Sequence, residues 1–343
     1  MNSSSYTRFL PLSLYGFFGG LCMALVSCGN GSQTVGGTAE ETFVAVTQMV
    51  DRPALNAVRD GIKDELSAAG YEAGTTLRWE WQSAKGSPVT ATHIANKYAG
   101  AQPDVIVAIA SHSAKTVVDT EQNTPIVFSA VADPVEAKLV KDIKKPSGNV
   151  SGNVSGNVSG VISPPPLKQQ LALVQEILPS VQTLGVIYSA GEDDPVDTIG
   201  QIANHASELG IIIEPIKVLN TNEITEAARS LVGTVDAIYV PTDKTITSVE
   251  AVVQVGKDNQ LPVFADNVKA IEQGAIATIS FDHYDVGRQT GALVVKVLKG
   301  TRPSDLAIEP VKVLKLSINP TAAASMGVEL PDSVIVRADQ TVK

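Results

Sequence analysis

Short apolar runs alternate with longer amphipathic segments along most of the chain. The runs are rich in Val and Ile, as in VIVAIA at 105–110 and AIYV at 237–240. The amphipathic segments have helical periodicity, and the one at 53–70 has Pro53 in its first turn and Gly70 as its stop. Strands that alternate with helices in this way are typical of a parallel sheet covered by helices. The pattern therefore predicts an α/β fold with parallel sheets.

The same pattern defines the expected elements in each half of the chain. Strands are predicted at 43–48, 77–82, 105–110, 126–129, 184–188, 211–217, 237–240, 262–265, 275–280 and 311–317. Helices are predicted at 53–70, 88–99, 167–179, 223–231, 246–259 and 285–300, after Ser111, after Asp133 with Pro134 in the first turn, and up to Leu209. Both halves repeat the order strand, helix, strand, so two lobes of one architecture are expected.

Residues 145–167, which read KPSGNVSGNVSGNVSGVISPPPL, separate the two halves. GNVS occurs there in three consecutive copies, at 148–159. A period of four residues is too short for a repeat architecture, so we interpret the stretch as an expanded connection. A chain of 343 residues also exceeds what one hydrophobic core usually organises. Two lobes with extended connections leave a cleft between them, which is a place to bind a small molecule.

The first 28 residues differ in kind from the rest. Arg8 precedes an apolar run at 9–26, and a small, polar stretch at 29–42 follows as a flexible tether. The tetrad LVSC that ends at Cys28 resembles the bacterial lipobox, in which the Cys is acylated after cleavage. We therefore expect a lipoprotein signal peptide at 1–28 and a lipid anchor on Cys28. An uncleaved membrane anchor and an ordinary signal peptide are the alternatives, and both also place the body outside the cytoplasm.

Composition excludes several classes of protein. The formal net charge of -10 disfavours a nucleic-acid partner, because no basic surface is available to release counterions. Hydrophobic residues make up 44% of the chain, which argues against disorder. The chain has no GxGxxG after a strand, no Walker loop and no GxSxG. Its four histidines, His93, His112, His205 and His283, lack zinc-ligand spacing. We therefore expect a non-enzymatic binding protein without a metal or cofactor.

Polar residues follow several predicted strands, at the edge where ligands bind in open parallel sheets. Gln48 ends the first strand, and Ser111 and Ser113 follow the strand at 105–110. Backbone N–H groups at a helix start favour carboxylates, so this position is a candidate anion site. Simple N-capping by Ser111 is the alternative. Thr242 and Asp243 occupy the corresponding position in the second half.

Motifs along the chain resemble one family in order and density. They are VTQMVDRPALNAVRDGIKDELSAAGY from Val46, IAS from Ile109, FSAVADPVEAKLV from Phe128, KPSGNVSG and SPPPLKQQL in the connection, VGTVDAIYVPTDK from Val232, GAIATISFDHYDVGRQTG from Gly274 and INPTAA from Ile318. The chain resembles the tryptophan/tyrosine-type substrate-binding proteins of bacterial ABC importers, a branch of the class I periplasmic-binding-protein fold. The likeness covers about residues 43–326.

The resemblance implies two Rossmann-like lobes joined by three crossovers, at 145–167, near Asp282 and near Ala307. Lobe 1 would comprise 43–161 plus 283–306, and lobe 2 would comprise 162–282 plus 307–343. It implies an extracytoplasmic, lipid-anchored monomer in the periplasm or at the cell surface. This protein would bind an amino-acid-like, possibly aromatic, small-molecule ligand between the lobes and deliver it to an ABC permease. A receptor for a signalling partner and an enzyme on a doubly wound fold are the alternatives.

Carried over position by position, the resemblance also implies a binding site. Its members are Gln48, Ser111, His112, Ser113, Ser129, Asp133, Glu192, Thr242, Asp243, Asp266, Asp282 and Tyr284. Hydroxyls and helix N-termini suit a carboxylate, acidic groups suit an ammonium, and Tyr284 offers a ring face. Asp133 and Asp243 have helix capping as an alternative role. His112 stands where a small residue or Pro is usual in the family, and Arg52 stands where His is usual. The ligand of the family is therefore not assigned to this chain.

The two extra GNVS copies are expected to loop out of the structure. Their eight residues would span roughly 26 to 29 Å if extended, and two further crossovers leave little room for such a change at the hinge. Insertion into the hinge strand would instead shift its register. Deletion of two copies should therefore leave ligand affinity, measured by calorimetry, unchanged. A large change in affinity would show that the repeat extends the hinge strand.

Overall fold

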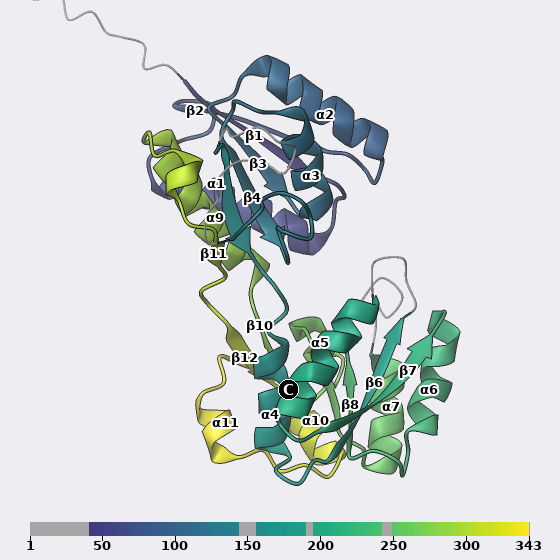
Figure 1. The fold of residues 1–343 in the computed structure, drawn as a ribbon. Coiled ribbons are helices and arrows are strands. Elements are labelled where there is room, and N and C mark those ends of the chain that lie inside the picture. The colour runs from purple at the N-terminus through teal and green to yellow at the C-terminus, as the bar shows by residue number, and fades with distance from the viewer. Residues whose placement is uncertain (1–40, 144–155, 190–194, 242–248, 343) are drawn as a thin grey trace, which may run out of the picture. The chain divides into compact units, whose positions relative to one another are not determined.

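The computed structural model describes residues 41–143, 156–189, 195–241 and 249–342 (Figure 1). The expected signal peptide, Cys28 and nearly all of the tether lie outside the described residues. Within the described part of the chain, no helix is long and apolar enough to cross a membrane.

The first sheet is parallel throughout and has the strand order β11-β5-β4-β3-β1-β2. Its strands are β1 Thr42–Gln48, β2 Leu77–Ser83, β3 Val105–Ile109, β4 Ile126–Val131, β5 Val158–Ile162 and β11 Glu309–Pro310. The helices that pack on it are α1 Pro53–Ala68, α2 Pro88–Ala101, α3 Ser111–Thr120 and α9 His283–Leu298. A short 3-10 helix, η2 Pro303–Asp305, follows α9.

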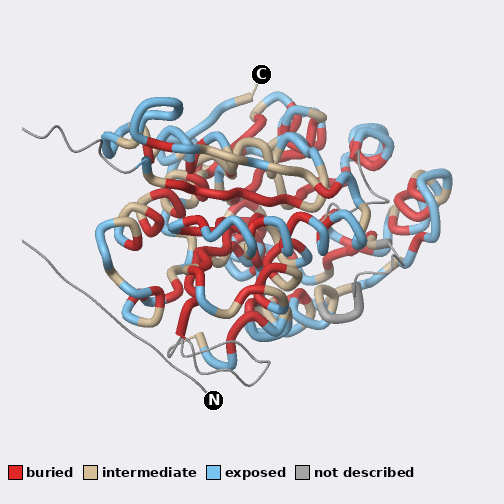
Figure 2. Tube along the Cα trace, turned by 90° about the horizontal axis from the view of Figure 1, so that it is seen from above, coloured by how far each residue is buried: buried red, intermediate tan, exposed pale blue. Residues whose placement is uncertain are grey.

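Two hydrophobic clusters lie on opposite faces of this sheet. One contains Tyr98 of α2 and Val117 of α3, and the other contains Ile62 of α1 and Val294 of α9. The inner strands β1, β3, β4 and β5 are almost entirely buried, whereas the edge strands β2 and β11 are mostly half-buried or exposed; Figure 2 shows buried segments in red. Strands buried on both faces read as continuous apolar runs, which explains why the sequence pattern revealed them.

The second half of the chain forms two further sheets. A parallel sheet in the order β7-β6-β8-β9 consists of β6 Thr183–Ser189, β7 Ile212–Val218, β8 Ala237–Val240 and β9 Val263–Ala265. A small mixed sheet consists of β10 Ala277–Ser280, β12 Lys315–Ile318 and β13 Gln340–Thr341. The two sheets adjoin, because the Ile276 N–H donates to the Val263 carbonyl at 2.8 Å.

Helices of the second half share one hydrophobic cluster with these strands. They are α4 Leu167–Ile177, α5 Pro195–Glu208, α6 Ile224–Ser230, α7 Glu250–Asn259, α8 Val268–Glu272, α10 Pro320–Ser325 and α11 Asp332–Val336, with the 3-10 turn η1 Thr221–Glu223 before α6. The predicted α/β fold with parallel sheets is confirmed.

Two predicted elements are wrong in part. No regular helix follows Asp133; its Oδ1 accepts from the N–H groups of Val135 and Glu136, but residues 134–139 form only turns. Lys138 has φ +56°, in the left-handed region, which a continuing helix does not tolerate. The strand expected at 311–317 begins only at Lys315, because the chain there passes from the first sheet to β12.

The last GNVS copy enters the first sheet. The first two copies, at 148–155, lie outside the described residues. The Asn157 amide donates to the Thr124 carbonyl at 2.9 Å, and the Asn157 carbonyl accepts from the Ile126 N–H at 2.7 Å. Val158 then begins β5. The last copy of the motif thus leads directly into this strand.

Helices α1 and α9 approach each other through glycines. A Cβ on Gly287 would lie 2.1 Å from the Val58 carbonyl oxygen, and a Cβ on Gly291 would lie 2.5 Å from Glu65 Cβ. Residue numbers rise together along this contact, so the helices are parallel and their N-termini lie side by side. Polar contacts flank the seam, including the Arg288–Glu65 ion pair at 2.8 Å.

Substitution of Gly287 by Ala tests this contact. The added methyl group would overlap the α1 backbone, which cannot move aside as a flexible side chain can, so we expect destabilisation of roughly 1–3 kcal/mol or more. Urea unfolding measures the change. The matched control is Gly100→Ala, at an exposed helical position with no atom within 4 Å of a built Cβ. The control should gain up to about 1 kcal/mol; equal stability of Gly287→Ala and the parent would contradict the close packing.

Candidate functional site

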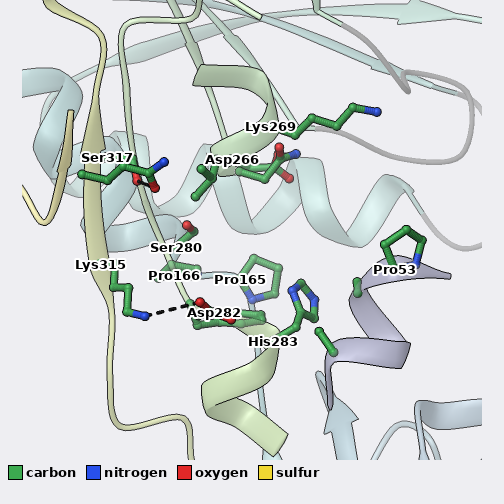
Figure 3. A pocket seen from close by; sticks show the side chains of 16 residues that line it. Pro53, Pro165, Pro166, Asp266, Lys269, Ser280, Asp282, His283, Lys315 and Ser317 are labelled. Carbon is green, nitrogen blue, oxygen red and sulfur yellow. Dashed lines mark hydrogen bonds and ion pairs between the residues drawn. The ribbon is translucent and has the colours of Figure 1, made fainter. Parts of the chain in front are cut away.

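A cavity of about 680 Å³ lies where the N-termini of α1 and α9 meet the ends of β9, β10 and β12 (Figure 3). This volume is within the range of small-molecule sites. It is lined by Pro53, Ala54, Ala57, Pro165, Pro166, Asp266, Asn267, Val268, Lys269, Ser280, Phe281, Asp282, His283, Lys315, Ser317 and Gln340. Proline, alanine and phenylalanine side chains give it an apolar wall, and two carboxylates and two ammonium groups supply charge.

Asp282 and Lys315 form one charged group at this cavity. Lys315 Nζ lies 2.6 Å from Asp285 Oδ2 and 3.4 Å from Asp282 Oδ2. The bond to Asp285 is the largest of several effects that raise the pKa of Lys315, so the ammonium stays charged. Asp282 also caps α9, because its Oδ1 accepts from the Tyr284 N–H at 2.8 Å. Asp282 is therefore held between a helix start and a cation that it shares with Asp285.

Asp266 directly follows the buried strand β9 and is itself half-buried. Its Oδ1 accepts from the Asn267 amide at 3.0 Å, while Asn267 caps the short helix α8 through the Ala270 N–H. The Asp266 backbone carbonyl accepts from Gln170 Nε2 at 3.1 Å. Side chain and backbone are both held, so the carboxylate has a defined place at the cavity.

His283 is a cavity residue that the sequence analysis considered only as a possible zinc ligand. It is the first residue of α9, and its ring meets the Phe281 ring edge-on, with centroids 5.3 Å apart. Burial lowers the pKa of His283, and the opposing effect of Asp282 is smaller. The imidazole is therefore neutral at pH 7. Its position one residue beyond Asp282, after a predicted strand, was the available clue.

The carboxyl edge of the first sheet holds a second set of predicted residues. The Gln48 amide donates to Asn56 Oδ1 at 2.8 Å, whereas its Oε1 is buried without a partner in the described residues. Ser113 Oγ is also buried and, within the same part of the chain, unpartnered. N-capping by Ser111, the alternative to an anion site at this position, is wrong. Ala110 is the N-cap, with φ 70° and ψ 159°, and no side chain caps α3.

Ala110 and Ala130 both have positive φ, of 70° and 55°. Ala110 directly follows β3, and Ala130 interrupts β4, both at the carboxyl edge of the first sheet. The Ala110 N–H donates to the Ser129 carbonyl at 2.8 Å. Positive φ is rare for residues other than glycine and costs of order 1–3 kcal/mol. His112 follows in the first turn of α3, where it is exposed. The residues of this edge, Gln48 and 111–113, do not line the cavity described above.

Three further predicted residues are engaged away from the cavity. The Ser129 hydroxyl lies 2.7 Å from that of Thr290, which itself donates to the Val286 carbonyl, so Ser129 is the donor in a buried pair between β4 and α9. The Tyr284 hydroxyl donates to Asp64 on α1 at 2.8 Å. Asp133 caps its turn. Glu192, Thr242 and Asp243 lie outside the described residues.

Of the predicted site, the structure thus places Asp266 and Asp282 together at the cavity. Sequence reasoning missed Lys269, His283, Lys315 and the wall formed by Pro165 and Pro166. In the part of the chain that the structure describes, no group of three or more His, Cys, Asp or Glu side chains could hold a metal ion.

Two lobes of parallel α/β architecture with a small-molecule cavity define the class I periplasmic binding proteins. The family model for ABC transporter substrate binding proteins matches residues 43–342, and the chain belongs to this family. It is similar to a tyrosine-binding protein of Clostridioides difficile, with 29% identity over 277 residues that cover 80% of this chain and 78% of the relative.

Solved structures agree with this assignment. An ABC domain from Streptococcus pneumoniae in complex with L-Trp is 30% identical, with a TM-score of 0.71, and the match covers 88% of this chain and 100% of that one. A ligand-free, open substrate-binding protein with adhesive properties from Clostridium difficile is 29% identical, with a TM-score of 0.78 and the same coverage.

The lowered pKa of His283 predicts a pH dependence of folding stability. The unfolded state takes up the proton first, near the ordinary His value of about 6.5. Above that pH, the neutral imidazole therefore makes its full contribution to the free energy of unfolding. This contribution is lost as the pH falls through the lower folded-state pKa. One proton changes the unfolding free energy by at most about 1.4 kcal/mol per pH unit. Urea unfolding of His283→Gln between pH 7 and 5 should show a shallower slope than the parent.

The matched control is His93→Gln, at an exposed position on α2. It should retain the slope of the parent. An unchanged slope in His283→Gln would mean that the buried imidazole does not resist protonation.

Proposed function

We propose that this protein is the solute-binding component of an ABC importer and that its ligand is an amino acid, with aromatic amino acids as the first candidates. The observation that carries the proposal is the cavity itself, in which Asp266 and Asp282 lie beside an apolar wall of Pro165, Pro166 and Phe281. An acidic group suits an ammonium and an apolar wall suits a side chain. Membership of the family supports the importer role.

Asp266 is the proposed partner of the ligand ammonium. Asp282 is less suited to that role, because its carboxylate already caps α9 and contacts Lys315. His283 and Phe281 offer ring faces to an aromatic side chain. The ligands of two similar proteins, tyrosine and L-Trp, are consistent with such a pocket.

The first turn of α3 is the proposed partner of the ligand carboxylate. Its N–H groups lack a side-chain cap, and Ser113 Oγ is buried without a partner in the described chain. Free N–H groups and the helix dipole favour an anion. In this proposal the ligand selects a closed arrangement of the two lobes, which brings α3 to the cavity.

Other parts of the proposal rest on the sequence. Cys28 would carry the lipid that holds the protein at a membrane outside the cytoplasm, and the protein would act as a monomer. The lobes would comprise 43–161 plus 283–306 and 162–282 plus 307–343, except that β11 pairs with β5 and so belongs to the first sheet, which puts the third crossover after Pro310. A membrane permease would receive the ligand.

A ligand screen tests the proposal directly. Residues 40–343, which form one compact unit, are mixed with each common amino acid and their unfolding is followed by calorimetry. A ligand at a hundred times its Kd adds about 2.7 kcal/mol of stability, which shifts Tm by several degrees. We expect such a shift with L-Trp, L-Tyr or a related amino acid. No shift across the whole panel would count against an amino-acid-binding role.

Asp266→Asn separates the ammonium contact from the rest of the site. Loss of a charged hydrogen bond costs about 1.5–3 kcal/mol, so affinity for the amino acid should fall roughly tenfold or more. Affinity for its deaminated analogue should change little. Asp258→Asn, an exposed substitution on α7, is the control and should bind both compounds like the parent. Equal losses for both compounds would assign Asp266 another role.

A further inference from the structure

A buried glutamine on α4 lies beneath the cavity. Gln170 is 2% exposed, and both ends of its side-chain amide are engaged. Its Nε2 donates to the carbonyls of Asp266, at 3.1 Å, and Ile279, at 2.8 Å. Its Oε1 accepts from the Tyr239 hydroxyl at 2.6 Å. One side chain thus connects α4, β8, β10 and the end of β9.

Tyr239 fixes which way the amide faces. It is 1% exposed, and burial, together with the nearby Asp266 carboxylate, raises the pKa of its hydroxyl. The hydroxyl therefore remains protonated and can act as the donor. A donor on one side obliges Gln170 to present oxygen to Tyr239 and both N–H groups to the two carbonyls.

The two carbonyls belong to the backbone that supplies cavity side chains. Asp266 itself lines the cavity, and Ile279 immediately precedes Ser280, which also lines it. After Asp266 the chain leaves the sheet for α8, so its carbonyl lies at the end of the strand. The Gln170 amide holds this strand end to β10.

The position of Gln170 also connects two crossovers. It lies one turn into α4, whose start follows Pro165 and Pro166 of the first crossover. Ile279 leads through Phe281 and Asp282 into the second. Both proline rings and both of these residues are cavity walls. A shift of Gln170 would therefore move the acidic and the apolar sides of the cavity relative to each other.

We propose that Gln170, oriented by Tyr239, is a positioning residue that holds the Asp266 carboxylate where it meets the ammonium of the ligand. The inference rests on the proposed function. It makes Gln170 matter for affinity without any contact between Gln170 and the ligand.

The test compares Gln170→Leu with the parent in calorimetric titrations. The probes are L-tryptophan and L-tyrosine, each paired with its deaminated analogue, 3-(indol-3-yl)propionate or 3-(4-hydroxyphenyl)propionate. Gln170→Leu should weaken amino-acid binding about tenfold and change binding of the analogues less than twofold. In an Asp266→Asn background, Gln170→Leu should cause no further loss. Independent, additive losses, or equal losses for both kinds of probe, would overturn the positioning role.

Gln175→Leu is the matched control. Gln175 lies on the same helix and also donates its amide to a backbone carbonyl, that of Leu209 at 2.9 Å, but neither Leu209 nor its chain neighbours line the cavity. It should bind all probes like the parent. Tyr239→Phe, which removes only the hydroxyl, covers the case in which Gln170→Leu fails to fold. It should reproduce the selective loss in weaker form, and unchanged selectivity would overturn the role assigned to Tyr239.

Crystal structures of the parent and of Tyr239→Phe and Gln170→Leu separate this inference from the proposed function. If the parent binds neither L-tryptophan nor L-tyrosine, these first candidates fail as ligands, but the position of Asp266 can still be compared. A displaced or disordered Asp266 carboxylate in the variants would support the positioning role. An Asp266 that keeps its place in both variants would overturn it whatever the ligand is.

Discussion

The close approach of α1 and α9 is the constraint on which the cavity depends. Gly61, Gly287 and Gly291 let the two helix backbones touch, although the helices are more than 200 residues apart in the chain. Because the helices are parallel, the contact brings the start of α9 to the start of α1. Pro53 and His283 become neighbours on one cavity wall. A larger residue at the seam would separate the helices and open that wall.

Several charged side chains of the cavity are already bound to other protein groups. Lys315 contacts both Asp282 and Asp285. These three side chains bind one another through Lys315, so they stabilise the cavity wall more than they attract a ligand. Asp266 is held at two points, because Gln170 donates to its backbone carbonyl and the Asn267 amide donates to its carboxylate. The polar groups of the cavity therefore fix the geometry of its walls.

The sequence predicts the order of strands and helices because apolar runs and Pro or Gly boundaries are local features. Asp266 and Asp282 were found through the family resemblance, and each also follows a predicted strand. Lys315 was not, because it meets Asp282 only when distant crossovers come together. Gln170 was not, because a glutamine in an amphipathic helix looks the same in sequence whether it is exposed or buried. The helix after Asp133 was wrong because tertiary packing, not propensity, sets the backbone at 134–139.

The two alanines with positive φ, Ala110 and Ala130, have a consequence for how this protein can change. Glycine would adopt these conformations more readily, so selection for thermal stability alone favours its appearance at either position. The Cβ that causes the strain also restricts the backbone at the start of α3, and glycine would give that restriction up. Replacement of either alanine by glycine would therefore raise the free energy of unfolding but would make the backbone at this edge of the first sheet less rigid. A relative that keeps both alanines and lives at a higher temperature would have to gain stability from substitutions at other positions.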